Sequence, residues 1–138
     1  MVEPADIVDF AQSFSGRSQG CGDHEDLLAT LAFDGDDASA FIEGFAEKYS
    51  VDMSAFLWFF HYNADEPPNF RRLRPVDREG KTFEDIPLTP RLLADAANLG
   101  HWPLEYPVHK MQASRWPMRL MFVFLATLVL LIVLVASD

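Results

Sequence analysis

The sequence predicts an all-α protein, in which a small helical bundle is followed by one C-terminal transmembrane helix. Two observations predict the bundle: apolar residues recur at helical spacing after Pro4, Asp34 and Thr89, and residues that start or stop helices flank these segments. The third observation is the run from Leu120 to Ser137, eighteen residues without a charge. A helix of this length is roughly 27 Å long, close to the ~30 Å hydrocarbon core of a bilayer.

The chain divides into three predicted parts. Residues 1–102 are expected to form the helical domain, with a loop or arm at 63–87. Residues 103–117 would form a stem, and residues 118–137 the transmembrane helix. About a hundred residues suffice for one small domain with a single core.

The first helix is expected from Pro4 to Phe14, because proline suits a first helical turn and apolar residues follow at helical spacing up to Gly16. The polar loop at 17–26 contains the single Cys21, which cannot form an internal disulfide. Cys21 and His24 alone make a weak metal site, so we interpret Cys21 as a loop thiol.

The clearest helix starts at Asp34, the expected N-cap. Its apolar face is expected to point into the core and carries Ala38, Phe41, Ile42, Phe45 and Tyr49. Acidic residues occupy its first turn and opposite face, and these are the predicted partner-binding residues: Asp34, Asp36, Asp37, Glu43 and Glu47. Calcium binding is disfavoured, because Ala38 stands where an EF-hand loop needs an oxygen ligand.

The aromatic segment at 53–62 is interpreted as core, with a structural His61 at its end. Prolines interrupt the arm at 63–87, which has a local surplus of basic residues: Arg71, Arg72, Arg74, Arg78 and Lys81. The arm could fold back on the acidic helix, meet anionic headgroups or stay solvated, and all three alternatives remain open.

The last helix of the domain should begin after Thr89 as N-cap, with Pro90 in its first turn, and end at Gly100. Its apolar stripe consists of Leu92, Leu93, Ala96 and Leu99. Trp102 is expected to pack back on this helix.

Positive charge favours the cytoplasmic side of a span, and Lys110, Arg115 and Arg119 precede the apolar run. We therefore expect a single-pass, tail-anchored protein in the cell inner membrane, with its N-terminal domain in the cytoplasm. The predicted membrane-anchor residues are Trp116, Arg119, Leu120, Phe122, Phe124 and Leu131.

Charge is distributed unevenly along the chain. Residues 1–60 contain twelve acidic and two basic residues, net −10, whereas residues 61–138 contain nine of each, net 0. Such an acidic module repels nucleic acid phosphates, so a DNA or RNA role is excluded and a basic protein partner is the natural complement.

No sequence motif for catalysis is present. The chain lacks a glycine-rich phosphate loop, HExxH, paired CxxC and GxSxG, and its four histidines are widely spaced. We therefore predict no enzyme, no catalytic residue, no cofactor and no metal site.

The chain resembles an acyl carrier protein in three consecutive segments: Leu31 to Ala38, the acidic helix through Phe45, and the following segment Tyr49 to Asp52. More closely, Asp34-Gly-Asp-Asp and the distal Leu99-Gly-His-Trp resemble a bacterial family of carrier-like proteins of unknown function. The resemblance covers roughly residues 4 to 102. It implies a carrier-like helical bundle whose acidic second helix docks on basic enzymes of lipid or fatty-acid metabolism.

One departure from the carrier pattern is decisive for the prediction. The carrier motif is Asp-Ser-Leu, and Gly35 occupies the place of the serine that carries phosphopantetheine. Ser39 and Ser54 are the nearest hydroxyls afterwards, but neither stands at the start of the helix. We therefore predict a membrane-tethered, carrier-like protein without the prosthetic group, which acts as a non-catalytic protein-binding module.

Two alternatives remain. The chain could be a genuine acyl or peptidyl carrier for membrane lipid enzymes, modified at an atypical serine. It could also be a regulatory subunit that assembles through its transmembrane helix, although that span lacks the small-xxx-small spacing that favours close helix packing.

Overall fold

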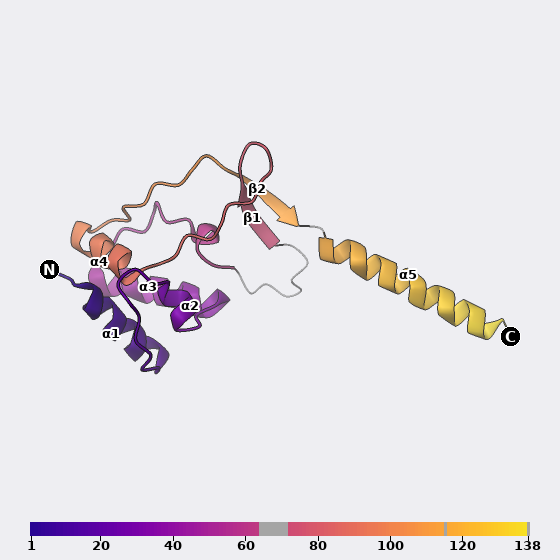
Figure 1. Cartoon of the computed structure of the whole chain (residues 1–138), viewed down its shortest axis with the longest axis horizontal. Helices are drawn as coiled ribbons and strands as arrows, with labels where there is room; N and C mark the ends of the chain where they lie inside the picture. Colours follow the sequence, from indigo (N-terminus) through magenta and orange to yellow (C-terminus); the bar gives the residue numbers. More distant parts are fainter. Residues whose placement is uncertain (64–71, 115, 138) are drawn as a thin grey trace.

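The computed structural model describes residues 1–63, 72–114 and 116–137 (Figure 1). Its helices and strands follow one another as α1 (Pro4–Ser15), α2 (Leu27–Thr30), α3 (Gly35–Tyr49), the 3-10 helix η1 (Trp58–Phe60), β1 (Arg72–Val76), α4 (Pro90–Leu99), β2 (Lys110–Ser114) and α5 (Trp116–Ala136). The fold is therefore mixed, with a helical body and a small antiparallel sheet.

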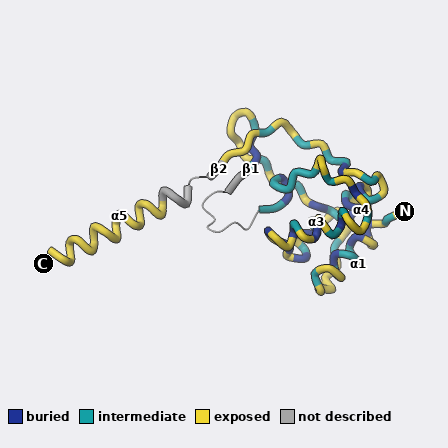
Figure 2. Tube along the Cα trace, turned by 180° about the vertical axis from the view of Figure 1, so that it is seen from behind, coloured by how far each residue is buried: buried dark blue, intermediate teal, exposed yellow. Residues whose placement is uncertain are grey.

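The core lies where α1, α3 and α4 meet (Figures 1 and 2). Ile7 and Ala11 of α1, Phe41 and Phe45 of α3, and Leu93 of α4 are completely buried. Burying a large apolar side chain contributes ~1.5–3 kcal/mol, so this shared interior is the main source of stability for the domain. It also fixes which face of α3 points outward.

The helix ends follow the local sequence signals. Gly16 and Gly100 have φ values of +68° and +77° and terminate α1 and α4, a conformation that glycine adopts without the steric penalty of other residues. The Thr89 hydroxyl accepts a hydrogen bond from the Leu92 N–H at 3.1 Å and caps α4. These predicted boundaries are confirmed.

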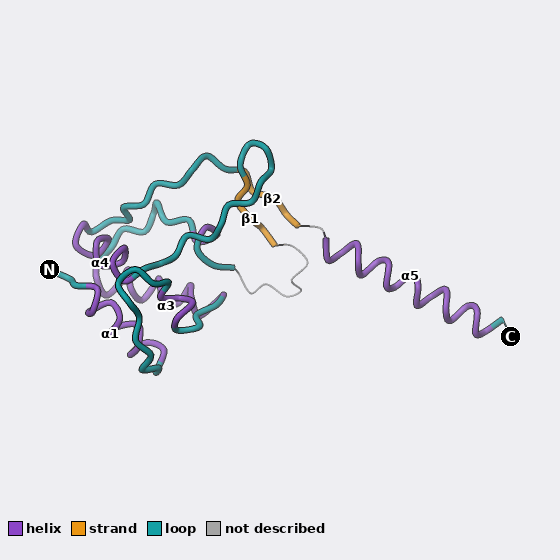
Figure 3. Tube along the Cα trace, in the orientation of Figure 1, coloured by secondary structure: helices purple, strands orange, loops and turns teal. Residues whose placement is uncertain are grey.

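Long loops cross the body between the helices, and backbone hydrogen bonds hold them in place (Figure 3). The Leu27 N–H donates to the Leu88 carbonyl at 2.9 Å. The Asp52 N–H donates to the Gly100 carbonyl, and the Trp102 N–H donates back to the Asp52 carbonyl, each at 2.9 Å. Trp102 is 4% exposed and packs into the core as predicted.

The all-α prediction is wrong, because β1 and β2 form an antiparallel pair with Arg72 opposite Ser114 and Val76 opposite Lys110. One strand comes from the predicted arm and the other from the predicted stem. The reason is non-local: five residues of alternating polar and apolar character are a weak strand signal, and neither segment shows which distant segment it pairs with. Pro75 is tolerated because its backbone faces away from β2, on the edge where its carbonyl accepts from the Phe83 N–H at 3.1 Å.

The basic residues of the predicted arm are only partly visible. Arg71 lies outside the described residues, and for Arg72 only the backbone is described. Beyond the strand the chain makes a tight turn, in which the Asp77 Oδ1 accepts hydrogen bonds from the N–H groups of Glu79 and Lys81 at 2.9 Å.

The prediction for the C-terminal segment also requires correction. In the parts of the chain that the structure describes, no helix is both long and apolar enough to cross a membrane. The predicted transmembrane helix, the single-pass tail anchor and the inner-membrane location with a cytoplasmic domain are therefore wrong.

Helix α5 itself points away from the rest of the molecule (Figure 1). Four predicted anchor residues on it are exposed: Leu120, Phe122, Phe124 and Leu131. The side chains of the other two, Trp116 and Arg119, lie outside the described residues.

Candidate functional site

The five acidic residues predicted to bind a partner lie on and next to α3, and all five are exposed: Asp34, Asp36, Asp37, Glu43 and Glu47. Glu43 and Glu47 are one helical turn apart, and Asp36 continues the same face toward the helix start. Ala38, Phe41, Ile42 and Phe45 are buried on the other face. Packing of this apolar face thus holds the carboxylates outward on a rigid helix.

The start of α3 differs from the prediction in one detail. Asp34 is the N-cap residue, but its side chain makes no capping hydrogen bond. Its backbone carbonyl accepts from the N–H groups of Asp37 and Ala38 at 2.9 and 3.3 Å. Because the Asp34 carboxylate is exposed and not used as a cap, it can contribute to the acidic surface.

Among the described residues, no ion pair involves these five carboxylates. Within the described residues the single ion pair joins Arg91 to Asp23, 3.4 Å apart, and both side chains are about half exposed. Exposed pairs of this kind contribute little to stability. The described basic side chains therefore leave the charge of the acidic face of α3 uncompensated.

Gly35, at the place of the carrier serine, is buried and has a φ of +47°. L-residues other than glycine lose roughly 1–2 kcal/mol in this left-handed conformation. The position therefore favours glycine and presents no side-chain group at the helix surface.

The two other serines considered as attachment points lie in different surroundings. Ser39 is half-buried within α3, next to Tyr62. Burial, followed by the nearby Glu43 charge, raises the pKa of Tyr62. Ser54 is exposed in a turn, where its N–H donates to the Asp52 Oδ1 at 2.9 Å.

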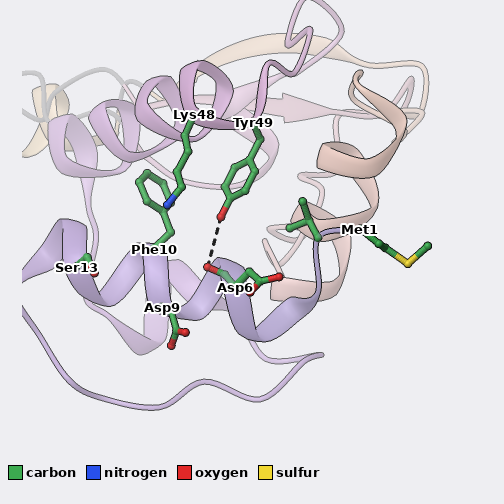
Figure 4. A pocket seen from close by; sticks show the side chains of 8 residues that line it. Met1, Asp6, Asp9, Phe10, Ser13, Lys48 and Tyr49 are labelled. Atoms are coloured by element: carbon green, nitrogen blue, oxygen red, sulfur yellow. Dashed lines mark hydrogen bonds between the residues drawn. The ribbon is translucent and has the colours of Figure 1, made fainter.

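A second candidate site is a pocket of about 440 Å³ between α1 and the end of α3 (Figure 4). Its wall is formed by Asp6, Asp9, Phe10 and Ser13 of α1 and by Lys48 and Tyr49 of α3, with Met1 and Val2 beside them. Volumes of 300–1,000 Å³ are typical of small-molecule sites. The pocket is therefore large enough for an amino-acid side chain.

Two aromatic rings form a corner of this pocket. The Phe10 and Tyr49 rings stand edge to face, with centroids 6.0 Å apart. The Lys48 Nζ lies over the Phe10 ring, 4.6 Å from its centroid, and 5.5 Å from the centroid of Tyr49 (Figure 4). These are cation–π distances, so a positive charge already occupies the corner.

Carboxylates complete the pocket. The Tyr49 hydroxyl donates to the Asp6 backbone carbonyl at 3.4 Å (Figure 4). The Asp6 side chain accepts from the Glu3 N–H at 2.8 Å. Partial burial raises the pKa of Tyr49, and the charges of Asp6 and Asp9 raise it further. The negative potential of both carboxylates therefore reaches the aromatic corner.

Away from both sites, His61 is the centre of a buried polar network and is 5% exposed. Its Nδ1 is 2.8 Å from the Ile86 carbonyl, and because a carbonyl only accepts, Nδ1 carries the proton. The Tyr106 hydroxyl therefore donates to Nε2 at 2.7 Å, while its oxygen accepts from the Trp102 indole N–H at 2.9 Å. Burial lowers the pKa of His61 to about 4.

Cys21 is a free, partly buried thiol. The Cys21 Sγ is 3.7 Å from the Thr30 hydroxyl, and partial burial raises the pKa of the thiol. This favours the unreactive thiol form. Within the described ranges, no three His, Cys, Asp or Glu side chains come close enough together to hold a metal ion.

The sequence analysis identified the acidic face of α3 but missed the pocket. The signal was present, because Asp6, Asp9 and Ser13 stand three and four residues apart on one helix and must share a face. The sequence could not predict that Lys48 and Tyr49 lie against this face, because their position depends on how α1 packs against α3.

Comparison with known proteins adds no relative to this description. No protein-family model, no curated protein and no solved structure matches the chain.

Proposed function

We propose that this chain is a carrier-like but non-catalytic protein-binding module, which docks a basic partner protein on the acidic face of α3. The observation that carries the proposal is the row of exposed carboxylates that no described basic residue neutralises. A basic enzyme of lipid or fatty-acid metabolism is the partner that the resemblance to acyl carrier proteins implies.

The placement of the acids suits recognition of a protein. Because the opposite face of α3 is packed into the core, Glu43 and Glu47 keep a fixed spacing and direction. Fixed charges steer a complementary partner and set its orientation, and they influence the association rate more than the final affinity.

The local structure at Gly35 supports binding without a prosthetic group. A serine there would be strained and buried rather than offered to a modifying enzyme. We therefore propose that the chain keeps the docking helix of a carrier and has lost the attachment point.

A charge-reversal experiment tests the docking face. Immobilised protein would be incubated with cell lysate, retained basic proteins identified, and the association rate of the best-retained one measured at about 0.05 and 0.15 M salt, where the Debye length falls from roughly 14 to 8 Å. The variant Glu43→Lys with Glu47→Lys should lower that rate at least about tenfold at the lower salt.

The matched control is Glu79→Lys with Glu84→Lys, which changes the net charge equally at exposed positions outside α3. The control should associate within about twofold of the unchanged protein. If both variants lost the same fraction of the association rate, the effect would be one of net charge alone. If neither variant lost association rate, docking on α3 would be refuted.

The rival function, a carrier modified at an atypical serine, makes a different prediction. Incubation with coenzyme A and a phosphopantetheinyl transferase would add a covalent group visible in the intact mass. Our proposal expects no mass increase, and an adduct on Ser39 or Ser54 would overturn it.

A further inference from the structure

The pocket between α1 and α3 contains a positive charge supplied by the chain itself. The Lys48 ammonium lies over the Phe10 ring, although two carboxylates, Asp6 and Asp9, line the same pocket. Lys48 forms no ion pair within 4.0 Å with either of them in the described structure. The aromatic corner, and not a salt bridge, is thus what holds the ammonium.

This hold is weak. An exposed cation–π contact contributes only about 0.5–1 kcal/mol, and Lys48 is an exposed residue on a flexible four-carbon stem. A better-matched cation can therefore replace it at small cost.

A guanidinium matches this pocket better than an ammonium. It is planar and stacks on aromatic faces, and it presents a fork of N–H donors suited to carboxylates. Phe10 and Tyr49 offer the faces, whereas Asp6 and Asp9 offer acceptors on the adjoining turn of α1. The pocket volume of about 440 Å³ admits such a side chain.

We propose that this pocket binds an arginine side chain, and that Lys48 occupies the site in the free protein and is displaced when the arginine enters. The inference rests on the proposed function only for the source of the arginine, which would be the basic partner that docks on the neighbouring face of α3. The acidic face of α3 would then attract the basic partner, and the pocket would select partners that carry an arginine at the matching position.

The test uses arginine amide as the probe and citrulline amide as its neutral isostere, with binding followed by amide chemical shifts in the full chain. Arginine amide should shift the signals of Phe10 and Tyr49 in a saturable way, and citrulline amide should not. Because Lys48 competes for the site, Lys48→Met should tighten binding roughly two- to fivefold, and Asp9→Asn should weaken it by a similar factor.

The matched control for Lys48→Met is Lys81→Met, which removes the same charge from an exposed turn outside the pocket. Binding to this control should stay within experimental error of the unchanged protein. If Lys48→Met bound no tighter than Lys81→Met, or if both probes bound equally, the inference would fail.

Failure here can be separated from failure of the docking proposal. Glu43 and Glu47 do not line the pocket, so their reversal to lysine should change arginine amide binding less than twofold. If that variant no longer docked the partner, and the unchanged protein did not bind arginine amide, the arginine-binding proposal would be refuted. The docking proposal would still be supported. Saturable arginine amide binding to the unchanged protein, together with unchanged partner docking in the Glu43→Lys, Glu47→Lys variant, would support the pocket and overturn the docking face.

Discussion

Stability of the domain should fall as the pH drops from 7 to 4, because of His61. The imidazole is buried and neutral, with its Nδ1–H donated to the Ile86 carbonyl and its Nε2 accepting from the Tyr106 hydroxyl. A second proton on Nε2 would face that hydroxyl oxygen, which already accepts from Trp102. Protonation therefore breaks the network as well as burying a charge.

The magnitude follows from the difference in pKa. In the folded chain the pKa of His61 is about 4, whereas an unperturbed histidine has a pKa of 6.5. The unfolded state therefore binds the proton first as the pH falls. Stability is complete above about pH 6.5, declines below it, and levels off near pH 4, with a total loss of about 3 kcal/mol at ~1.4 kcal/mol per pKa unit.

Urea unfolding at several pH values measures this loss. Small domains have total stabilities of about 5–15 kcal/mol, so the shift in midpoint should be plain. The variant His61→Gln should cost about 1–3 kcal/mol at pH 7, because buried hydrogen bonds are lost, but should then lose much less on acidification. Carboxylates that titrate near pH 4 affect both proteins equally and cancel in the comparison.

The control is His24→Gln, an exposed loop position that should keep the full pH dependence of the unchanged protein. Parallel pH curves for the unchanged protein and His61→Gln would refute the role of His61. An NMR titration that finds the His61 pKa near 6.5 in the folded chain would refute it directly.

Three further substitutions test other parts of the structure by urea unfolding at neutral pH. Tyr106→Phe should destabilise by about 2–4 kcal/mol, because three polar groups lose the hydroxyl they share; a loss below 1 kcal/mol would contradict the network. Gly44→Ala should stabilise by about 0.5–1 kcal/mol through helix propensity, since the added carbon would meet Phe14 at an ordinary 3.5 Å; a destabilised variant would show that α1 and α3 pack more tightly. Gly35→Ser should cost roughly 1–2 kcal/mol for its left-handed φ, and its intact mass should stay unchanged after incubation with coenzyme A and a transferase; a stable, modified variant would contradict the strain and burial inferred for a serine at this position.

Helices α1, α3 and α4 could be predicted because their signals are local. At α4, Thr89, Pro90 and Gly100 mark both ends, and each acts on backbone groups within four residues of itself. The acidic face of α3 was predictable for the same reason, since residue spacing alone decides which side chains share a face.

The sheet and the pocket could not be predicted, because both depend on segments that meet only after folding. Nothing near Arg74 specifies Gln112 as its partner across the sheet. Likewise, Phe10 meets Tyr49 only because α1 lies against α3. For the C-terminal run, hydropathy predicted the apolar helix, but the prediction that it crosses a membrane was wrong.

Two side chains whose residue types often take part in catalysis, Cys21 and His61, are not poised for it in the described domain. Cys21 and His61 are both held in their neutral forms, the thiol by a raised pKa and the imidazole by a lowered one. Both imidazole nitrogens are also engaged with protein groups, so His61 has no free position for a substrate. An acid–base group needs a pKa near the working pH and reach to the reacting atom, and His61 has neither. The exposed charges on α1 and α3 are therefore the groups through which we expect the described domain to act.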